Sequence, residues 1–390
     1  MKFFKWLIFF IAIAAIAALI FAPTLIDKQL NPVERSATEI RIPVAHQDVH
    51  DRLVIMDWHA DSTLWNRELL ERHDYGQVDV PRLQEGNVAI QMFTTVTKAP
   101  SGLNYQQNSA DATDQITQLA LVSAWPVRTW NNLTERALYQ AQKVKDAVKA
   151  SADLRLILNQ SDLSELLSLR AAGQQVVGAM IGTEGSHALE GSTLRIQDLY
   201  DAGFRMMSLQ HFFDNRLGGS LHGESNGGLT EFGKSAVEEM ERLRIIVDVS
   251  HSSEAVVRDV LEIASRPLVV SHTGVYGHCP KQRNISDELM FRIAEKGGLI
   301  AIGYWDGAVC ATGVEDVVNA MRYAIDLVGE DHVALGSDFD GTVTTPFDTS
   351  ELNLLTHTML EKGFTIKEIN KVMGSNSINF LRNYLPPGGE

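Results

Sequence analysis

Short apolar runs rich in β-branched residues alternate with longer amphipathic segments from about residue 51 onward. A short apolar run that ends in polar residues is typical of a buried parallel strand, and apolar residues at helical spacing predict a helix that packs on a sheet. Eight strands are expected, at Leu53–Asp57, Val88–Phe93, Val176–Gly182, Arg205–Gln210, Ile245–Val249, Leu268–Val270, Leu299–Tyr304 and Val333–Gly336. Helices are expected between them at Ala137–Lys149, Thr230–Leu243, Ser253–Ala264, Ser286–Lys296 and Val314–Val328.

Strands that alternate with helices predict an α/β fold, here a (β/α)8 TIM-type barrel over residues 51–386. Residues 98–130 interrupt the alternation and are interpreted as an insertion after the second strand, and residues 349–385 are expected to add closing helices. In such a barrel, the residues at the carboxyl ends of the strands line one mouth, where catalytic groups gather. The strand ends are therefore the places to search for chemistry.

The N-terminus differs in kind from the rest of the chain. Lys2 and Lys5 precede an apolar run from Trp6 to Ala22, which predicts a transmembrane helix over residues 1–26 that acts as a signal anchor, or a signal peptide that is cleaved. The basic flank favours export of the remainder, so the catalytic part is expected outside the cytoplasm, membrane-anchored or secreted. Residues 27–50 are polar and are expected to form a linker between the membrane and the barrel.

Composition limits the partners and the compartment. The chain has 45% apolar and 21% charged residues and a formal net charge of −15, which is typical of a globular protein and disfavours nucleic acid as a partner. The two cysteines, Cys279 and Cys310, do not have the spacing of a zinc knuckle. They could pair in an oxidising compartment or be two unrelated buried residues, and the sequence leaves both open.

Metal-ligating and acid–base residues gather at the expected strand ends. Each has an ordinary explanation taken singly: a histidine can be a hydrogen-bonded core residue, and an aspartate before glycine can form a turn. Together they offer enough nitrogen and oxygen ligands for two metal ions with a carboxylate between them. They are His59, Asp61, Glu184, His211, His251, His272, Tyr304, Asp338 and Asp340.

The residue types at the strand ends exclude one kind of bridge between the metals. No lysine stands at an expected strand end, which excludes a carbamylated lysine as the bridge and leaves Glu184 as the natural bridging carboxylate. His59 and Asp61 are two residues apart, so both side chains of an extended segment face the same side. His251 and His272 each close an apolar run in a Ser-His pair and are predicted to be ligands of the second metal.

Seven motifs in this order resemble the membrane dipeptidase family, also called renal dipeptidases (peptidase family M19). The resemblance extends from about Val54 to Phe380 and is carried by DWHADS, GTEGSHAL, SLQH, DVSH, SHTGVYG, KQRN and GSDFDG. It implies a (β/α)8 barrel with two zinc ions. His59 and Asp61 would hold one ion, His251 and His272 the other, and Glu184 both.

The resemblance also implies roles for the remaining residues. His211 would stabilise the oxyanion, Arg283 would bind the free carboxylate of a dipeptide, and Asp338 would carry the proton and contact the substrate amine. Tyr304 is a further candidate for substrate binding, and Cys279 and Cys310 resemble the positions of an intrachain disulfide in the vertebrate members. Where the family commonly has Asp-Gly-His-Asn-Asp, Trp58 and Ala60 differ here, which leaves the substrate range open.

The function implied is zinc-dependent hydrolysis of dipeptides, including those with a C-terminal D-residue, by a hydroxide that bridges the metals. A homodimer is expected from the same resemblance. The alternative is another binuclear metal-dependent amidohydrolase that acts on cyclic amides, lactones or phosphoesters and needs no free substrate carboxylate.

Overall fold

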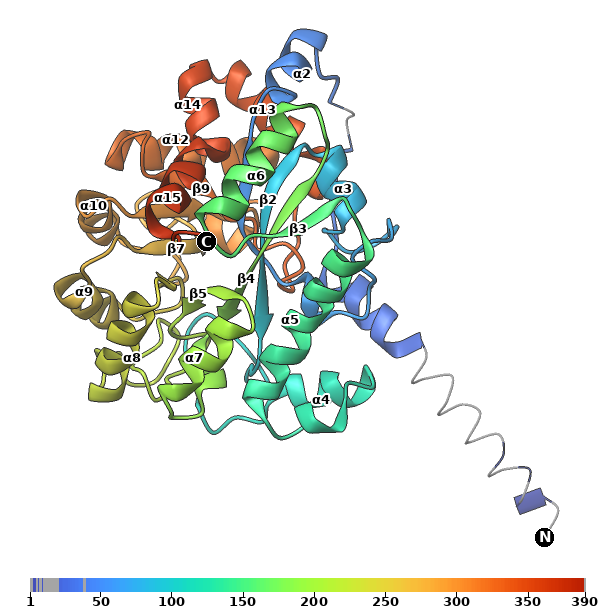
Figure 1. Cartoon of the computed structure of the whole chain (residues 1–390), viewed down its shortest axis with the longest axis vertical. Coiled ribbons are helices and arrows are strands. Elements are labelled where there is room, and N and C mark those ends of the chain that lie inside the picture. Colours follow the sequence, from blue (N-terminus) through green and yellow to red (C-terminus); the bar gives the residue numbers. More distant parts are fainter. Residues whose placement is uncertain (1–2, 5, 7–8, 10–20, 38–39, 389–390) are drawn as a thin grey trace.

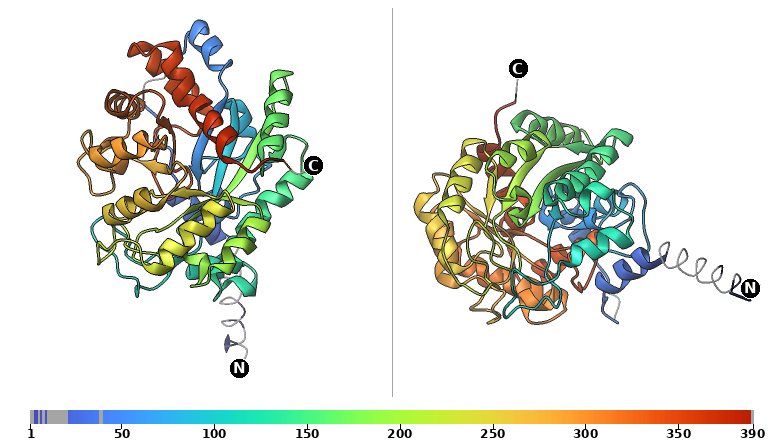
Figure 2. Two further views of the ribbon diagram at one scale, coloured as in Figure 1. Left: turned by 60° about the vertical axis from the view of Figure 1, so that its left-hand side comes forward. Right: turned by 90° about the horizontal axis from the view of Figure 1, so that it is seen from below.

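The computed structural model describes residues 3–4, 6, 9, 21–37 and 40–388 of the 390-residue chain. Every pair of neighbouring strands is parallel, and helices surround the strands on the outside (Figures 1 and 2). The strands are β1 Ile55–Ala60, β2 Val88–Val96, β3 Leu154–Leu156, β4 Val177–Glu184, β5 Phe204–Ser208, β6 Ile246–Asp248, β7 Val269–Thr273, β8 Leu299–Ile302 and β9 Val333–Leu335.

Eight of these strands form a closed barrel. They follow the order β2-β1-β9-β8-β7-β6-β5-β4, and the pairing of β2 with β4 closes the ring, as expected for a (β/α)8 barrel. The ninth strand, β3, was not expected. It pairs with residues 177–179 of β4, whereas β5 pairs with residues 181–183, so β3 and β5 share one edge of β4. With three residues, β3 is too short to show a period of two in the sequence.

The five expected amphipathic segments are helical, as α5, α8, α9, α10 and α12, and helices also close the chain within residues 349–385 as expected. The remaining helices between residues 44 and 309 were not expected. Thr230 accepts a hydrogen bond from the Gly233 amide at the start of α8, and Ser253 accepts one from the Val256 amide at the start of α9, which explains where these two helices begin. The helices are α2 Val44–His50, α3 Val80–Glu85, α4 Gln115–Val122, α5 Leu133–Ala150, α6 Gln160–Ala171, α7 Leu194–Asp201, α8 Glu231–Arg242, α9 Glu254–Ile263, α10 Asp287–Glu295, α11 Asp306–Val309, α12 Val314–Val328, α13 Asn353–Glu361, α14 Ile366–Asn370 and α15 Asn376–Tyr384.

The inside of the barrel is filled by a cluster of buried side chains to which all eight barrel strands contribute. Methionines are prominent in it, among them Met56, Met92, Met180 and Met206, and their flexible side chains fill an irregular space. A larger cluster joins the opposite faces of the strands to the surrounding helices. The inside of the barrel is therefore a packed core and not a pore, and catalytic groups are expected at its mouth.

The segment over residues 27–50, expected to be a linker, packs on the barrel instead. The Asp27 carboxylate lies 2.7 Å from Arg67 Nε, and the Asn31 side chain accepts a hydrogen bond from the Thr342 amide. Val33 forms a parallel bridge with Thr345, and α2 ends in the buried His50. Polar side chains that pair with partners far along the chain produce no apolar pattern, which is why the sequence suggested a tether.

The predicted transmembrane helix over residues 1–26 falls largely outside the described residues. Residues 21–30 are helical, and none of the helices in the described part of the chain is both long and apolar enough to cross a bilayer. The anchor therefore remains a prediction.

The two cysteines, whose pairing the residues alone left open and the family resemblance implied, are paired in the structure. Cys279, in the loop after β7, forms a disulfide with Cys310 at the end of α11. Arg283 lies in the same loop, so the disulfide ties the segment that carries this predicted substrate ligand to the segment that follows β8.

Candidate metal centre and active site

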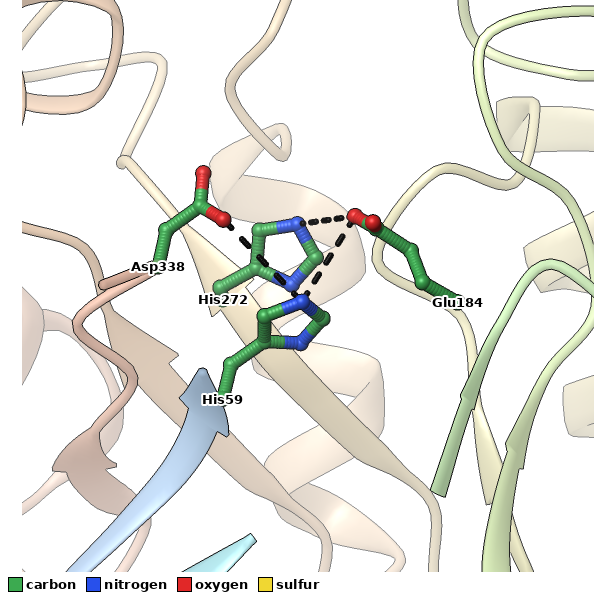
Figure 3. Close-up of side chains that lie close together, drawn as sticks. All are labelled: His59, Glu184, His272 and Asp338. Atoms are coloured by element: carbon green, nitrogen blue, oxygen red, sulfur yellow. Dashed lines mark ion pairs between the residues drawn. The ribbon is translucent and has the colours of Figure 1, made fainter. Parts of the chain in front are cut away.

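The five predicted metal ligands converge at the carboxyl ends of the barrel strands. β1 and β7 run further toward the mouth than expected, so His59 and His272 lie within strands, and Glu184 is the last residue of β4. Asp61 follows β1 and His251 follows β6 by three residues. Figure 3 shows His59, Glu184, His272 and Asp338 pointing toward one another from these different segments.

Glu184 lies at the centre of the group. Its Oε1 atom is 3.6 Å from His59 Nε2, 3.1 Å from His251 Nε2 and 3.3 Å from His272 Nε2. The Nε2 atoms of His251 and His272 are themselves 2.9 Å apart. One carboxylate oxygen thus lies close to a histidine of each predicted ligand pair, the position expected of a bridging residue.

The first ligand pair is also close. His59 Nε2 lies 3.7 Å from Asp61 Oδ2, and the other oxygen of Asp61 accepts a hydrogen bond of 2.6 Å from Thr94. His59 Nε2 is fully buried and has no hydrogen-bond partner of its own. A buried nitrogen without a partner, facing carboxylates, is the arrangement expected of a residue that ligates a cation.

The two Ser-His pairs of the sequence prove to be parts of one network. Ser271 Oγ lies 3.0 Å from His59 Nδ1 and 3.0 Å from His272 Nδ1, so a single hydroxyl contacts one predicted ligand of each metal. Ser271 and Ser250 both donate hydrogen bonds to Asp248, at 2.7 and 2.5 Å, and their hydroxyls lie 3.0 Å apart. These contacts fix the orientation of the imidazoles.

The roles of Ser271 and Asp248 were missed by sequence reasoning. The signal was present, because each predicted ligand of the second metal is preceded by serine and Asp248 stands two residues before Ser250. What the sequence could not show is that strand pairing between β6 and β7 would place both serines on one carboxylate.

The pKa values of the buried carboxylate and histidine side chains at the site are strongly shifted. Burial raises the pKa of Glu184 well above its ordinary value, and the neighbouring carboxylates of Asp61 and Asp338 raise it further. Burial lowers the pKa of His251 and of His272 well below that of a free histidine, and the positive charge of Arg283 contributes. Divalent cations would favour the ionised carboxylates and neutral imidazoles, so the donor set fits metal ions.

Asp338 lies on the rim of this group, with Oδ1 4.0 Å from His59 Nε2. Burial is the main cause that raises its pKa to about 7. Its backbone has a φ of 61°, in the left-handed region that costs a non-glycine residue free energy. The surrounding loop holds it there, since Ser337 and Asp340 on either side are fully buried and hydrogen-bonded.

Asp340, which also follows β9, has a structural role. Its Oδ1 lies 2.6 Å from Arg67 and accepts a hydrogen bond from the Gln77 amide, while Oδ2 accepts one from Ser62. The buried charge is thus paired and hydrogen-bonded away from the metal ligands.

His211 faces the other oxygen of Glu184, with Nε2 3.4 Å from Oε2. Its Nδ1 lies 3.2 Å from the Lys98 carbonyl oxygen, which can only accept, so Nδ1 donates. Burial lowers the pKa of His211 to about 4, and the neutral ring therefore presents Nε2 as an acceptor. His211 can donate a hydrogen bond to an oxyanion only after it has taken up a proton.

Arg283 is buried at the site, and its hydrogen bonds within the protein do not use all of its N–H donors. Its two terminal nitrogens donate to the backbone carbonyls of Ser250 and His272, and its guanidinium lies 5.3 Å from the centre of the Trp305 ring. A guanidinium has five N–H donors, so others are free to bind a carboxylate.

The structure does not bring Tyr304 into the site. Tyr304 is fully buried and packs against Phe339 and Phe347, at ring-centre distances of 5.5 and 5.4 Å. The next residue, Trp305, lines the cavity instead. β8 ends at Ile302, before both aromatic residues, so the alternation of a strand does not extend to them. The sequence therefore could not show which of the two faces the mouth.

A cavity of about 410 Å³ opens above these residues, within the range of small-molecule sites. Glu184, His211, Arg283 and Asp338 contribute to its polar floor. Much of its remaining wall is apolar and comes from the 98–130 insertion and the N-terminal helix, with Leu103, Ile116, Leu119, Val122, Ile26 and Leu30. The insertion that interrupted the strand–helix alternation thus forms a wall of the cavity.

A closed parallel barrel whose strand ends hold clustered histidines and carboxylates defines a metal-dependent hydrolase of the (β/α)8 class. Residues 44–384 match the family described as membrane dipeptidase (peptidase family M19), and the chain belongs to that family.

Two fungal relatives are dipeptidases by name. Dipeptidase aclJ of Aspergillus oryzae is 28% identical over 357 residues, covering 86% of this chain and 79% of that protein. Dipeptidase tcpJ of Claviceps purpurea is 27% identical, covering 79% of this chain and 69% of that protein.

Solved structures share the fold. A metallo peptidase from Rhodobacter sphaeroides, liganded with a phosphinate mimic of the dipeptide L-Ala-D-Ala, has a TM-score of 0.67 and 24% identity, and the match covers 85% of this chain and 99% of that one. The probable dipeptidase PvdM from Pseudomonas aeruginosa has a TM-score of 0.70 and 16% identity, with coverage of 87% and 98%.

Proposed function

We propose that this protein is a dipeptidase that holds two zinc ions and hydrolyses dipeptides, including those with a C-terminal D-residue. The observation that carries the proposal is the position of Glu184, whose Oε1 lies within 3.6 Å of His59 and within 3.3 Å of both His251 and His272. His59 and Asp61 would hold one ion, His251 and His272 the other, and Glu184 both. Nitrogen and carboxylate ligands of this kind suit zinc.

Bound zinc supplies polarisation of the peptide carbonyl and activation of water. The protein's own groups supply the proton transfers. Asp338 has a pKa of about 7, so near neutral pH it can accept a proton from water and return it to the leaving amine. The negative charge of the developing oxyanion would raise the pKa of His211 from its low value, so that Nε2 takes up a proton and donates a hydrogen bond to the oxyanion.

Arg283 would set the length of the substrate. Its planar guanidinium offers paired donors to the free carboxylate of a dipeptide, in a buried position where an unpaired carboxylate could not be accommodated. A longer peptide would bring an uncharged amide to this position and lose the charge-assisted hydrogen bonds. This selection favours dipeptides over cyclic amides, lactones and phosphoesters, which carry no such carboxylate.

The decisive experiment compares L-Ala-D-Ala and L-Ala-L-Ala with their C-terminal amides on protein of measured zinc content. We expect both dipeptides to be hydrolysed, the amides to be poor substrates, and about two zinc ions per chain. Removal of zinc by a chelator should abolish activity, and added zinc should restore it. Hydrolysis of the amides at the rate of the dipeptides would favour the alternative amidohydrolase.

We further propose that residues 1–26 anchor the chain in a membrane, with the barrel outside the cytoplasm. The basic residues before the apolar run and the Cys279–Cys310 disulfide support this location, because disulfides persist in oxidising compartments. Fractionation of cells that express the full chain, followed by protease protection, would test it.

The homodimer expected from the family resemblance stays a prediction, which sedimentation of the detergent-solubilised chain would test.

A further inference from the structure

We propose a second, separate metal site on the outside of the barrel, where His46, His357 and Glu361 would bind one zinc ion or a similar transition-metal ion. His46 belongs to α2, and His357 and Glu361 to α13. One ligand atom from each of the three residues lies within 4.8 Å of the other two. The site shares no residue with the barrel mouth.

The spacing on α13 suits a shared ligand. Residues four apart on a helix lie on the same face, so His357 and Glu361 present an imidazole and a carboxylate side by side. His46 approaches from α2, with Nδ1 2.7 Å from His357 Nδ1. Its other nitrogen, Nε2, lies 3.9 Å from Glu361 Oε1, and one of the two His46 nitrogens would bind the ion. Two imidazoles and a carboxylate are a donor set that zinc accepts, with water in the fourth position.

The close approach of two imidazole nitrogens has a parallel at the barrel mouth. His251 Nε2 and His272 Nε2, both predicted ligands of one metal, lie 2.9 Å apart. Two nitrogens bound to one tetrahedral zinc at ordinary bond lengths would be about 3.3 Å apart, so His46 and His357 would need to separate only slightly. The His46 side chain is 21% exposed and the Glu361 side chain is 63% exposed, so both have room to move by that amount.

A metal here would reinforce the contact between α2, early in the chain, and α13, late in the chain. The polar contacts between α2 and α13 include a hydrogen bond from Asn353 to Gln47 and one between His50 and Thr356, each of 2.9 Å. Single hydrogen bonds contribute little net stability. A metal ion with ligands on both helices would fix α2, and with it the segment that leads from the N-terminus, against α13.

Zinc titration of the full chain with its barrel site intact tests the proposal. We compare the wild type, the double variant His46→Ala/His357→Ala and a control variant, His73→Ala/His278→Ala, by equilibrium dialysis against zinc alone and metal analysis. The wild type and control should bind one more zinc per chain than the His46→Ala/His357→Ala variant. Dipeptide turnover should be the same in all three, which shows that the barrel is folded and loaded.

Two further results decide the interpretation. Glu361→Gln should weaken binding of the additional ion about tenfold, and added zinc should raise the unfolding temperature of the wild type and not that of the double variant. Equal zinc content of the wild type and the double variant across the titration would overturn the proposal and leave an imidazole–imidazole hydrogen bond beside a glutamate. If the wild type and the double variant bind equal amounts of zinc but both hydrolyse dipeptides, the dipeptidase proposal still holds.

Discussion

Glu184 Oε1, at the end of β4, lies 3.1 Å from Nε2 of His251, which follows β6. Replacing Glu184 by glutamine keeps its size and removes the negative charge that would hold two cations. We expect Glu184→Gln to lose zinc and to reduce turnover by at least about 100-fold, since even residues that only support metal ligands cost 10–100-fold. Metal analysis with steady-state kinetics measures both, and Glu238→Gln on the exposed face of α8 is the control. Full zinc content with normal turnover would contradict the bridging role.

Ser271 contacts the imidazoles of His59 and His272, a predicted ligand of each metal, so its hydroxyl should matter although it is not itself a predicted ligand. We expect Ser271→Ala to weaken zinc affinity about 10–100-fold while KM at saturating zinc changes little. Competition with a zinc chelator measures the affinity. Ser235→Ala, at an exposed position of α8, should change nothing. An unchanged affinity in Ser271→Ala would mean that the strands alone orient the ligands.

Variants of Arg283 and of Asp338 should affect different kinetic constants, because Arg283 is expected to bind the substrate and Asp338 to transfer the proton. Arg283→Lys loses the planar pair of donors and should raise KM about 10–100-fold for dipeptides but not for their C-terminal amides.

Asp338→Asn cannot carry a proton and should lower kcat about 10²–10⁴-fold with zinc still bound. The two kinetic constants, measured with metal content, distinguish these effects. Near-normal turnover of Asp338→Asn would exclude it as the proton carrier.

The apolar wall of the cavity predicts a preference for large apolar first residues. Each buried methylene group contributes about 0.8 kcal/mol, so Leu-D-Ala should exceed Gly-D-Ala in kcat/KM by at least about tenfold. Leu119→Asn, on the cavity side of α4, should reduce this ratio. Leu121→Asn is the matched control, because Leu121 lies on the same helix and is 44% exposed. Equal ratios in the two variants would exclude a contact between the substrate and this wall.

His187 predicts an acid-sensitive contribution to stability. It stacks on Phe213 with its Nε2 buried and unpaired, and burial lowers its pKa to about 3. Because the unfolded chain binds this proton more readily, the contribution is complete above about pH 6.5 and is lost as the pH falls toward 3. At pH 5 the loss amounts to about 2 kcal/mol. Urea unfolding at pH 7.5 and pH 5 should show a smaller loss in His187→Gln than in the wild type or in His73→Gln, and equal losses would contradict the assignment.

Much of the barrel could be predicted because its elements are local patterns. The apolar runs of β4 and β8 and the amphipathic face of α12 are visible in short windows of sequence. The clustering of His59 and Glu184 followed from the same patterns, because parallel barrel strands bring their carboxyl ends to one mouth. The docking of residues 27–33 could not be predicted, since it depends on pairs such as Asp27 with Arg67 that form only in the folded chain.

The sequence by itself therefore determined which residues stand at the strand ends and, through them, the kind of chemistry at the mouth. Only the tertiary structure decided that Ser271 contacts both His59 and His272, that Trp305 and not Tyr304 lines the cavity, and that the 98–130 insertion contributes to its apolar wall. The physical reason is that periodicity along a chain fixes which residues share a face. The side chain that meets a given partner depends on strand register and on packing between distant segments.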